Sequence, residues 1–255
     1  MRNFVSDWFY LSARCTKQIW RPLLALIPSL FIPIFFFFVN ANSLGAIAKS
    51  PGFPNVSYRD FIAPVAMFTA VFFSAGNAGI EMVQDISNGY FKKLMIMPIN
   101  RLAILLGRLT EVAIQAVMQG LIVLVLLLAV GVNFRTGFFG IISIFVILIL
   151  FAMAWSCVSM IAALRTQNAR LVQSMFVIVF PFLYITTSQA PKSLLSPTFR
   201  VLSSYNPVTY VIEGVRALVI SGWSDPAIPE AFATVVVLFL ILVVFTLASF
   251  QKAMK

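Results

Sequence analysis

The segment that decides the fold is residues 81–108, which read EMVQDISNGYFKKLMIMPINRLAILLGR. It is the longest charged and polar interruption between the apolar runs of the chain. On a helix, one apolar stripe at steps of three and four would be formed by Val83, Ile86, Tyr90, Leu94 and Met97, and another face would carry Gln84, Asp85, Asn88 and Lys92. Pro98 would stop this helix, and Gly89 can break it in the middle. Such a segment can lie against a membrane and offer its polar face to another molecule.

The composition is that of a membrane protein. Of the 255 residues, 61% are hydrophobic and 10% are charged, and the mean hydropathy is +0.99. Soluble chains carry about 25% charged residues. We therefore expect an all-α membrane protein that crosses the bilayer several times, with its formal charge of +10 carried mainly by loops. In that setting residues 81–100 are interpreted as a cytoplasmic segment through which a partner protein drives the membrane domain. The alternative is an ordinary amphipathic loop between two spans.

Several kinds of chemistry are missing from the sequence. It contains no histidine, which excludes haem ligation through histidine, zincin-type metal sites and a Ser/His intramembrane protease. Cys15 and Cys157 support neither a disulfide framework nor a metal site. No G-x-x-x-x-G-K-[ST] motif occurs, so the chain cannot bind ATP by a P-loop. The scattered acids, which include Asp7, Asp60, Glu81 and Asp85, offer no convergent carboxylate cluster for metal-dependent phosphoryl transfer within the membrane. We therefore expect neither an enzyme nor a bound metal or cofactor.

Six apolar runs are long enough to cross a bilayer at about 20 residues per crossing. They lie at 22–43, 60–80, 102–133, 137–164, 170–190 and 229–251. The first run could mimic a secretory signal, but an amphipathic segment precedes it where a signal has a short basic tail. Within the third run, Arg108 and Glu111 stand one helical turn apart and are expected to pair, which lowers the cost of placing them in a span.

Residues 1–21 predict a helix that lies in the plane of the membrane. One stripe is apolar and consists of Phe4, Trp8, Leu11, Cys15 and Ile19, and the opposite stripe consists of Asp7, Tyr10, Arg14, Lys17 and Arg21. The basic face would meet anionic headgroups or a partner. The alternative is that this helix serves as an anchor and nothing more.

Residues 200–222 are the second informative stretch. Asn206 suits a helix N-cap, Pro207 suits the first helical position, and Gly222 suits the stop. This helix is too short to cross the bilayer, and its charges are Glu213 and Arg216, which are spaced to pair. It is either a re-entrant hairpin or an interfacial helix outside the bilayer, and the sequence leaves both open.

Charge on the loops predicts the orientation. Six spans place both termini on one side, and that side carries 12 of the 18 Lys and Arg residues, the other 6 lying opposite. The richer side has Arg2, Arg14, Lys17, Arg21, Lys92, Lys93, Arg101, Arg108, Arg165, Arg170, Lys252 and Lys255. By the positive-inside rule both termini are cytoplasmic. We find no internal repeat or half-chain symmetry, which argues against an inverted-repeat transporter.

Two motifs resemble one family. Residues 92–101, KKLMIMPINR, followed by Gly107 and Arg108, resemble the signature loop of type-2 ABC exporter permeases, and in particular of their daunorubicin-resistance branch. Residues 206–216, NPVTYVIEGVR, resemble that family's second signature. The N-terminal interfacial helix, the six spans, the cytoplasmic coupling helix and the extracellular re-entrant hairpin of the family fall at matching places. The branch often has Arg where Lys92 and Lys93 stand, a change that keeps the charge but removes planar bidentate pairing.

The resemblance implies a subunit that is driven by ATP bound to another protein. A separate cytoplasmic ATPase would bind ATP and contact the coupling residues, which would be Glu81, Asp85, Gly89, Lys92, Lys93, Pro98 and Arg101. A lid on the outer side would be fixed by Asn206, Pro207, Glu213 and Arg216. The partners would be ATPase subunits, a second permease copy or a relative of it, and membrane lipid, with no nucleic acid. The location would be a bacterial inner membrane.

The resemblance leaves the cargo open among amphipathic small molecules such as antibiotics, lipids and glycans, and no substrate-binding residue is predicted. The competing class is an ion- or proton-coupled secondary transporter, for which Glu111 and Glu213 are the candidate titrating acids. Each has an arginine one turn away, which favours an ion-pair role. A membrane-embedded enzyme acting on lipid is the third class, and no motif supports it.

Overall fold

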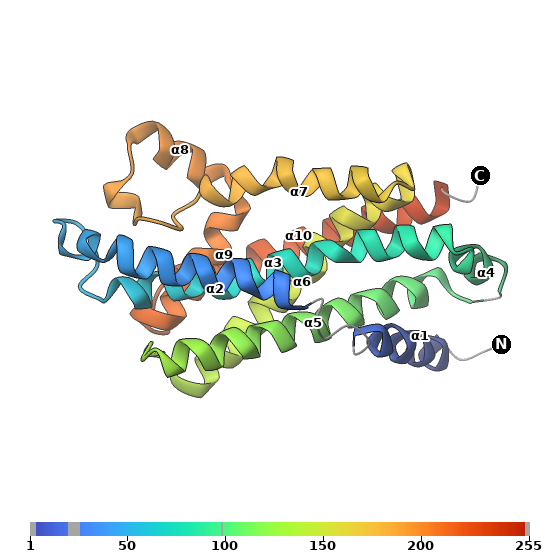
Figure 1. Cartoon of the computed structure of the whole chain (residues 1–255), viewed down its shortest axis with the longest axis horizontal. Coiled ribbons are helices and arrows are strands. Elements are labelled where there is room, and N and C mark those ends of the chain that lie inside the picture. Colours follow the sequence, from blue (N-terminus) through green and yellow to red (C-terminus); the bar gives the residue numbers. More distant parts are fainter. Residues whose placement is uncertain (1–3, 20–25, 98, 253–255) are drawn as a thin grey trace.

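The computed structural model describes residues 4–19, 26–97 and 99–252, which form a bundle of long helices (Figure 1). The described part contains no strand, as expected for an all-α protein. The α-helices are α1 (Phe4–Ile19), α2 (Leu26–Ser43), α3 (Tyr58–Ser87), α4 (Tyr90–Ile96), α5 (Arg101–Ala129), α6 (Gly137–Thr166), α7 (Ala169–Tyr184), α8 (Pro197–Tyr205), α9 (Pro207–Arg216) and α10 (Ala227–Lys252). Short helical turns are η2 (Gly45–Lys49), η3 (Lys192–Leu194) and η4 (Ala217–Ser221).

Helix α3 is the centre of the bundle. It packs against α2, α5, α6, α7 and α9, and its most apolar 18-residue window is 78% buried, against 17% for that of α10. Its start is fixed by Ser57, whose side chain accepts a hydrogen bond from the backbone N–H of Asp60. On α6, the hydroxyl of Ser159 accepts from the backbone N–H of Gly79 at 3.1 Å, so the two backbones lie close together.

Part of the bundle consists of helices that can span a membrane. Among the described residues, four helices are long and apolar enough to span a bilayer, namely Tyr58–Ser87, Leu102–Ala129, Gly137–Thr166 and Ala227–Phe250. Two shorter apolar helices lie at Ser29–Ser43 and Ala169–Tyr184. The chain is therefore an all-helical protein with several membrane-spanning helices.

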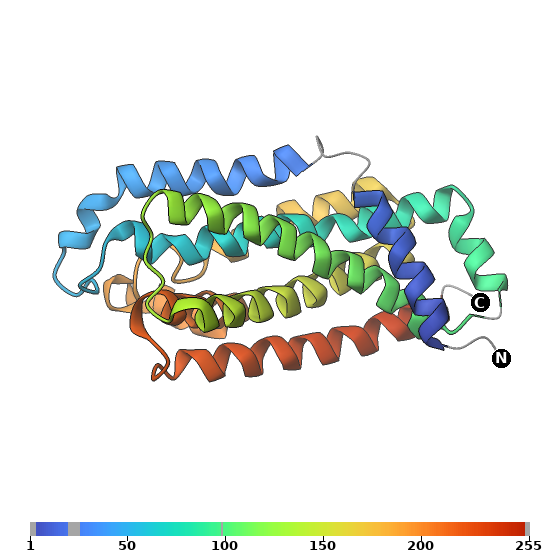
Figure 2. The same ribbon diagram turned by 90° about the horizontal axis from the view of Figure 1, so that it is seen from below.

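The two ends of the bundle are built differently. Helices α1 and α4 and the last turns of α10 lie at one end, which we call the α4 end, and Figure 2 shows α1 lying across α5 there. The turn η2 and helices α8 and α9 lie at or toward the opposite end, which we call the α8 end (Figure 1). Both chain-terminal helices thus reach the α4 end.

The structure differs from the sequence prediction at several boundaries. The predicted span at 60–80 continues as α3 to Ser87, so the segment 81–100 is two pieces of helix joined at a corner. Gly89 makes that corner with φ of 69°, a left-handed conformation that suits glycine. The break predicted at Gly89 is therefore confirmed. The predicted run 102–133 ends as a helix at Ala129, and the run 170–190 ends at Tyr184.

Candidate functional site

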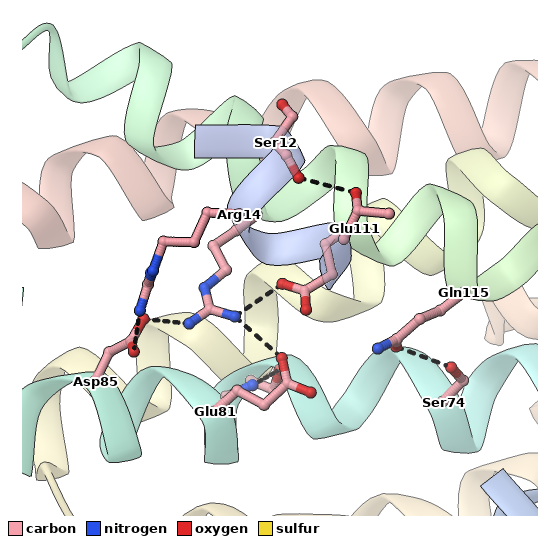
Figure 3. A network of polar contacts seen from close by, with 11 residues as sticks. Ser12, Arg14, Ser74, Glu81, Asp85, Glu111 and Gln115 are labelled. Carbon is pink, nitrogen blue, oxygen red and sulfur yellow. Dashed lines mark hydrogen bonds and ion pairs between the residues drawn. The ribbon is translucent and has the colours of Figure 1, made fainter. Parts of the chain in front are cut away.

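A buried arginine organises the α4 end. Arg108 on α5 is 3% exposed, and its Nη1 donates to Glu111 at 2.8 Å and to Glu81 at 3.1 Å. Its Nη2 donates to Asp85. The predicted pair of Arg108 with Glu111 is thus confirmed, and two acids from α3 join it. Figure 3 shows the three carboxylates converging from α3 and α5. A buried charge needs such partners, because water no longer solvates it.

A second arginine brings α1 into the same group. Nη2 of Arg14 lies 3.5 Å from Oδ1 of Asp85 (Figure 3), and the Arg14 guanidinium stacks 3.4 Å from the centre of the Tyr90 ring on α4. We call Arg14, Glu81, Asp85, Arg108 and Glu111 the charge network. It connects α1, α3 and α5 directly, and α4 through Tyr90.

Helix α1 lies close against α5 because Gly107 leaves room for it. A Cβ atom added at Gly107 would lie 2.9 Å from Cβ of Leu11. Nε1 of Trp8 donates to the hydroxyl of Thr110 at 3.0 Å. Cys15 is 4% exposed, and burial raises the pKa of its thiol to about 12. The predicted apolar stripe of residues 1–21 is thus packed against protein at Leu11 and Cys15.

The charge network is followed along α5 by further polar contacts on the same helix face. Gln115 accepts from the hydroxyl of Ser74 on α3 at 3.2 Å, and Nε2 of Gln119 donates to Ser29 on α2 at 3.0 Å. Together with Arg108 and Glu111 these residues recur at steps of three and four, so they lie on one face. The polar face therefore extends from the α4 end into the apolar part of the bundle.

Helix α4 has an inner and an outer face. Phe91 and Leu94 are buried, and the Phe91 ring centre lies 5.7 Å from that of Phe250 on α10. Lys92 and Lys93 are exposed, and the side chains of Ile96 and Met97 are 78% and 47% exposed. The prediction that Met97 continues the apolar stripe beyond Leu94 is therefore wrong, because the chain leaves the helix at this C-cap and is extended there.

The predicted coupling residues fall into four groups, the first of which is Gly89 at the corner between α3 and α4. Lys92 and Lys93 are exposed on α4. Glu81 and Asp85 lie within the charge network, so the carboxylate of Asp85 already pairs with two arginines of this chain. Pro98 lies outside the described residues, as does the side chain of Arg101. A role of these residues at a partner interface stays a prediction.

Asn206 joins two helices at the α8 end. Its side-chain oxygen caps α9 by accepting from the backbone N–H of Val208 at 3.0 Å, as predicted, and Pro207 follows at the first helical position. Its Nδ2 also donates to the carbonyls of Phe182 and Ile185 at 2.7 and 2.9 Å. Those carbonyls belong to the end of α7, which has no further turn to satisfy them. Sequence spacing gives no signal for this second contact.

Arg216 is a buried arginine at the α8 end, and within the described ranges no carboxylate forms an ion pair with it. Its Nε donates to the carbonyl of Phe61 at 3.1 Å, and Nη2 donates to the carbonyl of Thr187 at 2.8 Å. The predicted pair of Glu213 with Arg216 is wrong, because Glu213 pairs with Lys192 at 2.7 Å. Both side chains thus contact residues that are distant in the sequence, and they do not pair with each other. The stretch 200–222 consists of α8, α9 and η4, and whether it enters the bilayer stays a prediction.

Both regions lie within one stretch that matches a known family. Residues 6–220 match the model of the ABC-2 type transporter family. The chain belongs to this family. A protein of Cyanophora paradoxa named as transport permease ycf38 is 23% identical over 220 residues, covering 84% of this chain and 74% of that protein. A protein of Mycobacterium tuberculosis named as doxorubicin resistance ABC transporter permease DrrC is 21% identical over 221 residues, covering 87% and 79%.

Membership of the ABC-2 type transporter family confirms the resemblance drawn from residues 92–101 and 206–216. A permease that belongs to this family takes part in transport across a membrane and pairs with an ABC ATPase subunit, and the matching family is not a catalytic one. Residues that sequence reasoning missed are Tyr90 as a partner of Arg14 and Lys192 as the partner of Glu213. Both contacts join segments far apart in the chain, so helical spacing could not find them.

Proposed function

We propose that this chain is the transmembrane subunit of an ATP-driven exporter in a bacterial inner membrane. Its six spans would be α2, α3, α5, α6, α7 and α10, with both termini in the cytoplasm. ATP would be bound by a partner ATPase, and a second permease copy or relative would complete a dimer. Family membership and the printed names of the relatives support transport by a permease.

The observation that carries the proposal is the construction of α4. Its outer face offers the exposed side chains of Lys92, Lys93 and Ile96, while its inner face is packed on the bundle. Because Tyr90 at its start contacts Arg14 of the charge network, a push on α4 would be passed to α1, α3 and α5. A rigid helix whose outer face is exposed and whose inner face is packed on the bundle can transmit the closure of the ATPase subunits to the membrane domain.

The proposed cargo is an amphipathic small molecule, a lipid or a glycan. A cavity between α2, α3 and α7 has mainly apolar walls, which include Phe36, Phe37, Phe73 and Phe180. Polar side chains at the same cavity include Asn40, Thr69, Ser188 and Gln189. Pockets of this kind bind ligands with apolar bodies and few polar groups. This supports an amphipathic small molecule over a lipid or a glycan as the cargo.

The experiment is purification and reconstitution. The tagged chain is expected to co-purify with an ATPase and, in vesicles, to move cargo when ATP is supplied. Charge reversal at Lys92 and Lys93 together is expected to abolish co-purification, whereas Arg59→Glu, at an exposed basic residue near the α8 end, serves as the matched control and keeps it. Transport driven by a pH gradient without nucleotide would instead support the secondary transporter.

A further inference from the structure

The charge network holds more acids than bases. Among the described residues it brings together the carboxyl groups of Glu81, Asp85 and Glu111 and the guanidinium groups of Arg14 and Arg108. With every group ionised, three negative charges would face two positive ones. In a site from which water is largely excluded, such an excess charge is expensive. Binding one proton would bring the two signs into balance.

The geometry selects the acid that would take the proton. Asp85 uses both carboxylate oxygens, one toward each arginine. Glu111 is 1% exposed, and its Oε2 accepts from Nη1 of Arg108, a nitrogen that also serves Glu81. Its other oxygen, Oε1, is buried and has no hydrogen-bond partner among the described residues. An ionised oxygen in that position would carry charge without solvent or a donor.

We propose that Glu111 is a proton-binding site, with the proton on Oε1 and Oε2 still accepting from Arg108. A neutral carboxyl group at this position leaves Glu81 and Asp85 to balance Arg14 and Arg108. The buried oxygen then becomes part of an uncharged O–H group, which costs less to bury than an ionised oxygen. Proton binding at Glu111 does not depend on the direction of transport or on the cargo.

The groups that face Glu111 make proton binding sensitive to the arrangement of the helices. From α5 it faces Arg108, from α3 Glu81 and Asp85, and from α1 Cys15. Arg14 of α1 lies on the far side of Asp85, with Tyr90 of α4 stacked against it. The negative charge of Glu81 favours the neutral form of Glu111. A movement that takes an acid of α3 away from Arg108 would leave Glu111 as the ion-pair partner and release the proton.

The proton can be observed by infrared spectroscopy of the purified full chain in lipid nanodiscs. A neutral carboxyl group has a C=O stretching band distinct from that of a carboxylate. We expect such a band at neutral pH, lost as the pH is raised, and absent from Glu111→Gln. Glu213→Gln is the matched control, because Glu213 has Lys192 as its own partner, and it should keep the band.

A second variant keeps the proposal testable if Glu111→Gln does not fold. Glu81→Gln removes a neighbouring negative charge while keeping the shape of the side chain, so the band should disappear at a lower pH than in the unmodified chain. A chain without a titrating neutral-carboxyl band, or a band that persists in Glu111→Gln, would overturn the assignment. So would a band whose titration is the same in Glu81→Gln as in the unmodified chain.

Discussion

Each end of the molecule contains a buried arginine, and the two are satisfied in different ways. Arg108, at the α4 end, is held by three carboxylates from α3 and α5. Arg216, at the α8 end, is held by the backbone carbonyls of Phe61 and Thr187 and stacks 3.8 Å from the centre of the Phe61 ring. Carboxylates sit on side chains that can change partner, whereas these carbonyls are fixed by the fold.

The charge network at the α4 end therefore depends on a balance of charges, whereas Arg216 at the α8 end links helices through hydrogen bonds to neutral groups. The partners of Arg108 carry charges that depend on one another, so altering one member alters the whole charge network. The partners of Arg216 are neutral, and its side chain joins α9 to the start of α3 and to the segment after α7. We therefore expect the α4 end to respond to changes of charge and the α8 end to respond to loss of hydrogen bonds.

The largest effect is expected from Arg108→Ala. It leaves the buried acids Asp85 and Glu111 and the partly exposed Glu81 without their shared cation, and breaking a buried ion pair by removing one partner costs about 3 to 5 kcal/mol. We expect the variant to lose most of its folded population, measured by thermal unfolding of the detergent-purified chain. Arg108→Lys should lose less, because one charge remains but the fork geometry is gone. Equal stability of Arg108→Ala and the unmodified chain would refute the account of the α4 end.

A smaller effect is expected from Arg216→Ala. It leaves the carbonyls of Phe61 and Thr187 without donors, which costs about 1 to 3 kcal/mol for buried acceptors. Since the partners of Arg216 in the described part of the chain are neutral, the apolar variant Arg216→Met should restore part of the loss by filling the space, whereas Arg108→Met should restore little. Thermal unfolding of the detergent-purified variants measures both effects. If Met restores the same stability at both positions, the proposed difference between the two ends is refuted.

The sequence predicted contacts within a helix better than contacts between helices. The pairing of Arg108 with Glu111 and the capping of α9 by Asn206 follow from spacing along one segment, and both are confirmed. The pairing of Glu213 with Arg216 follows from the same rule and is wrong. Lys192 and the carbonyls of Phe61 and Thr187 are nearer to those groups than each is to the other.

The sequence also did not predict how far α3 extends. Glu81 and Asp85 look like the start of a polar loop, because acids rarely continue a membrane span. They stay helical because Arg108 and Arg14 neutralise them from α5 and α1. Those arginines are 27 and 71 residues away in sequence from their acidic partners. The fold class, the corner at Gly89 and the pair of Arg108 with Glu111 were predictable, and the contacts of the charge network between different helices were not.

A third test concerns the corner between α3 and α4. Gly89 has φ of 69°, and a residue with a Cβ pays about 1 to 2 kcal/mol for a left-handed conformation. Gly89→Ala should therefore lower stability modestly, and Gly89→Pro more, because proline cannot reach this φ and loses the hydrogen bond from the Gly89 N–H to the Ile86 carbonyl. If α4 transmits ATPase closure, both variants should retain membrane insertion and reduce ATP-driven export in vesicles.

The smallest change in stability is expected from Arg14→Ala, and its effect is best seen at Cys15. The Arg14 side chain is 34% exposed, so its pairing with Asp85 and stacking on Tyr90 together contribute about 1 kcal/mol or less. Loosening α1 would expose Cys15 and return its pKa from about 12 toward the ordinary value, which increases the reactive thiolate at neutral pH.

Maleimide labelling of chains that carry Cys157→Ala, so that Cys15 is the one thiol present, measures this opening. We expect faster labelling in Arg14→Ala than in the parent, and no change in Lys93→Ala, which removes an exposed cation of α4. Because a thiol that is 4% exposed reacts when α1 moves away, the labelling rate reports the docking of α1 directly. Equal rates in all three chains would mean that packing at Leu11 and Gly107 holds α1 without help from the charge network.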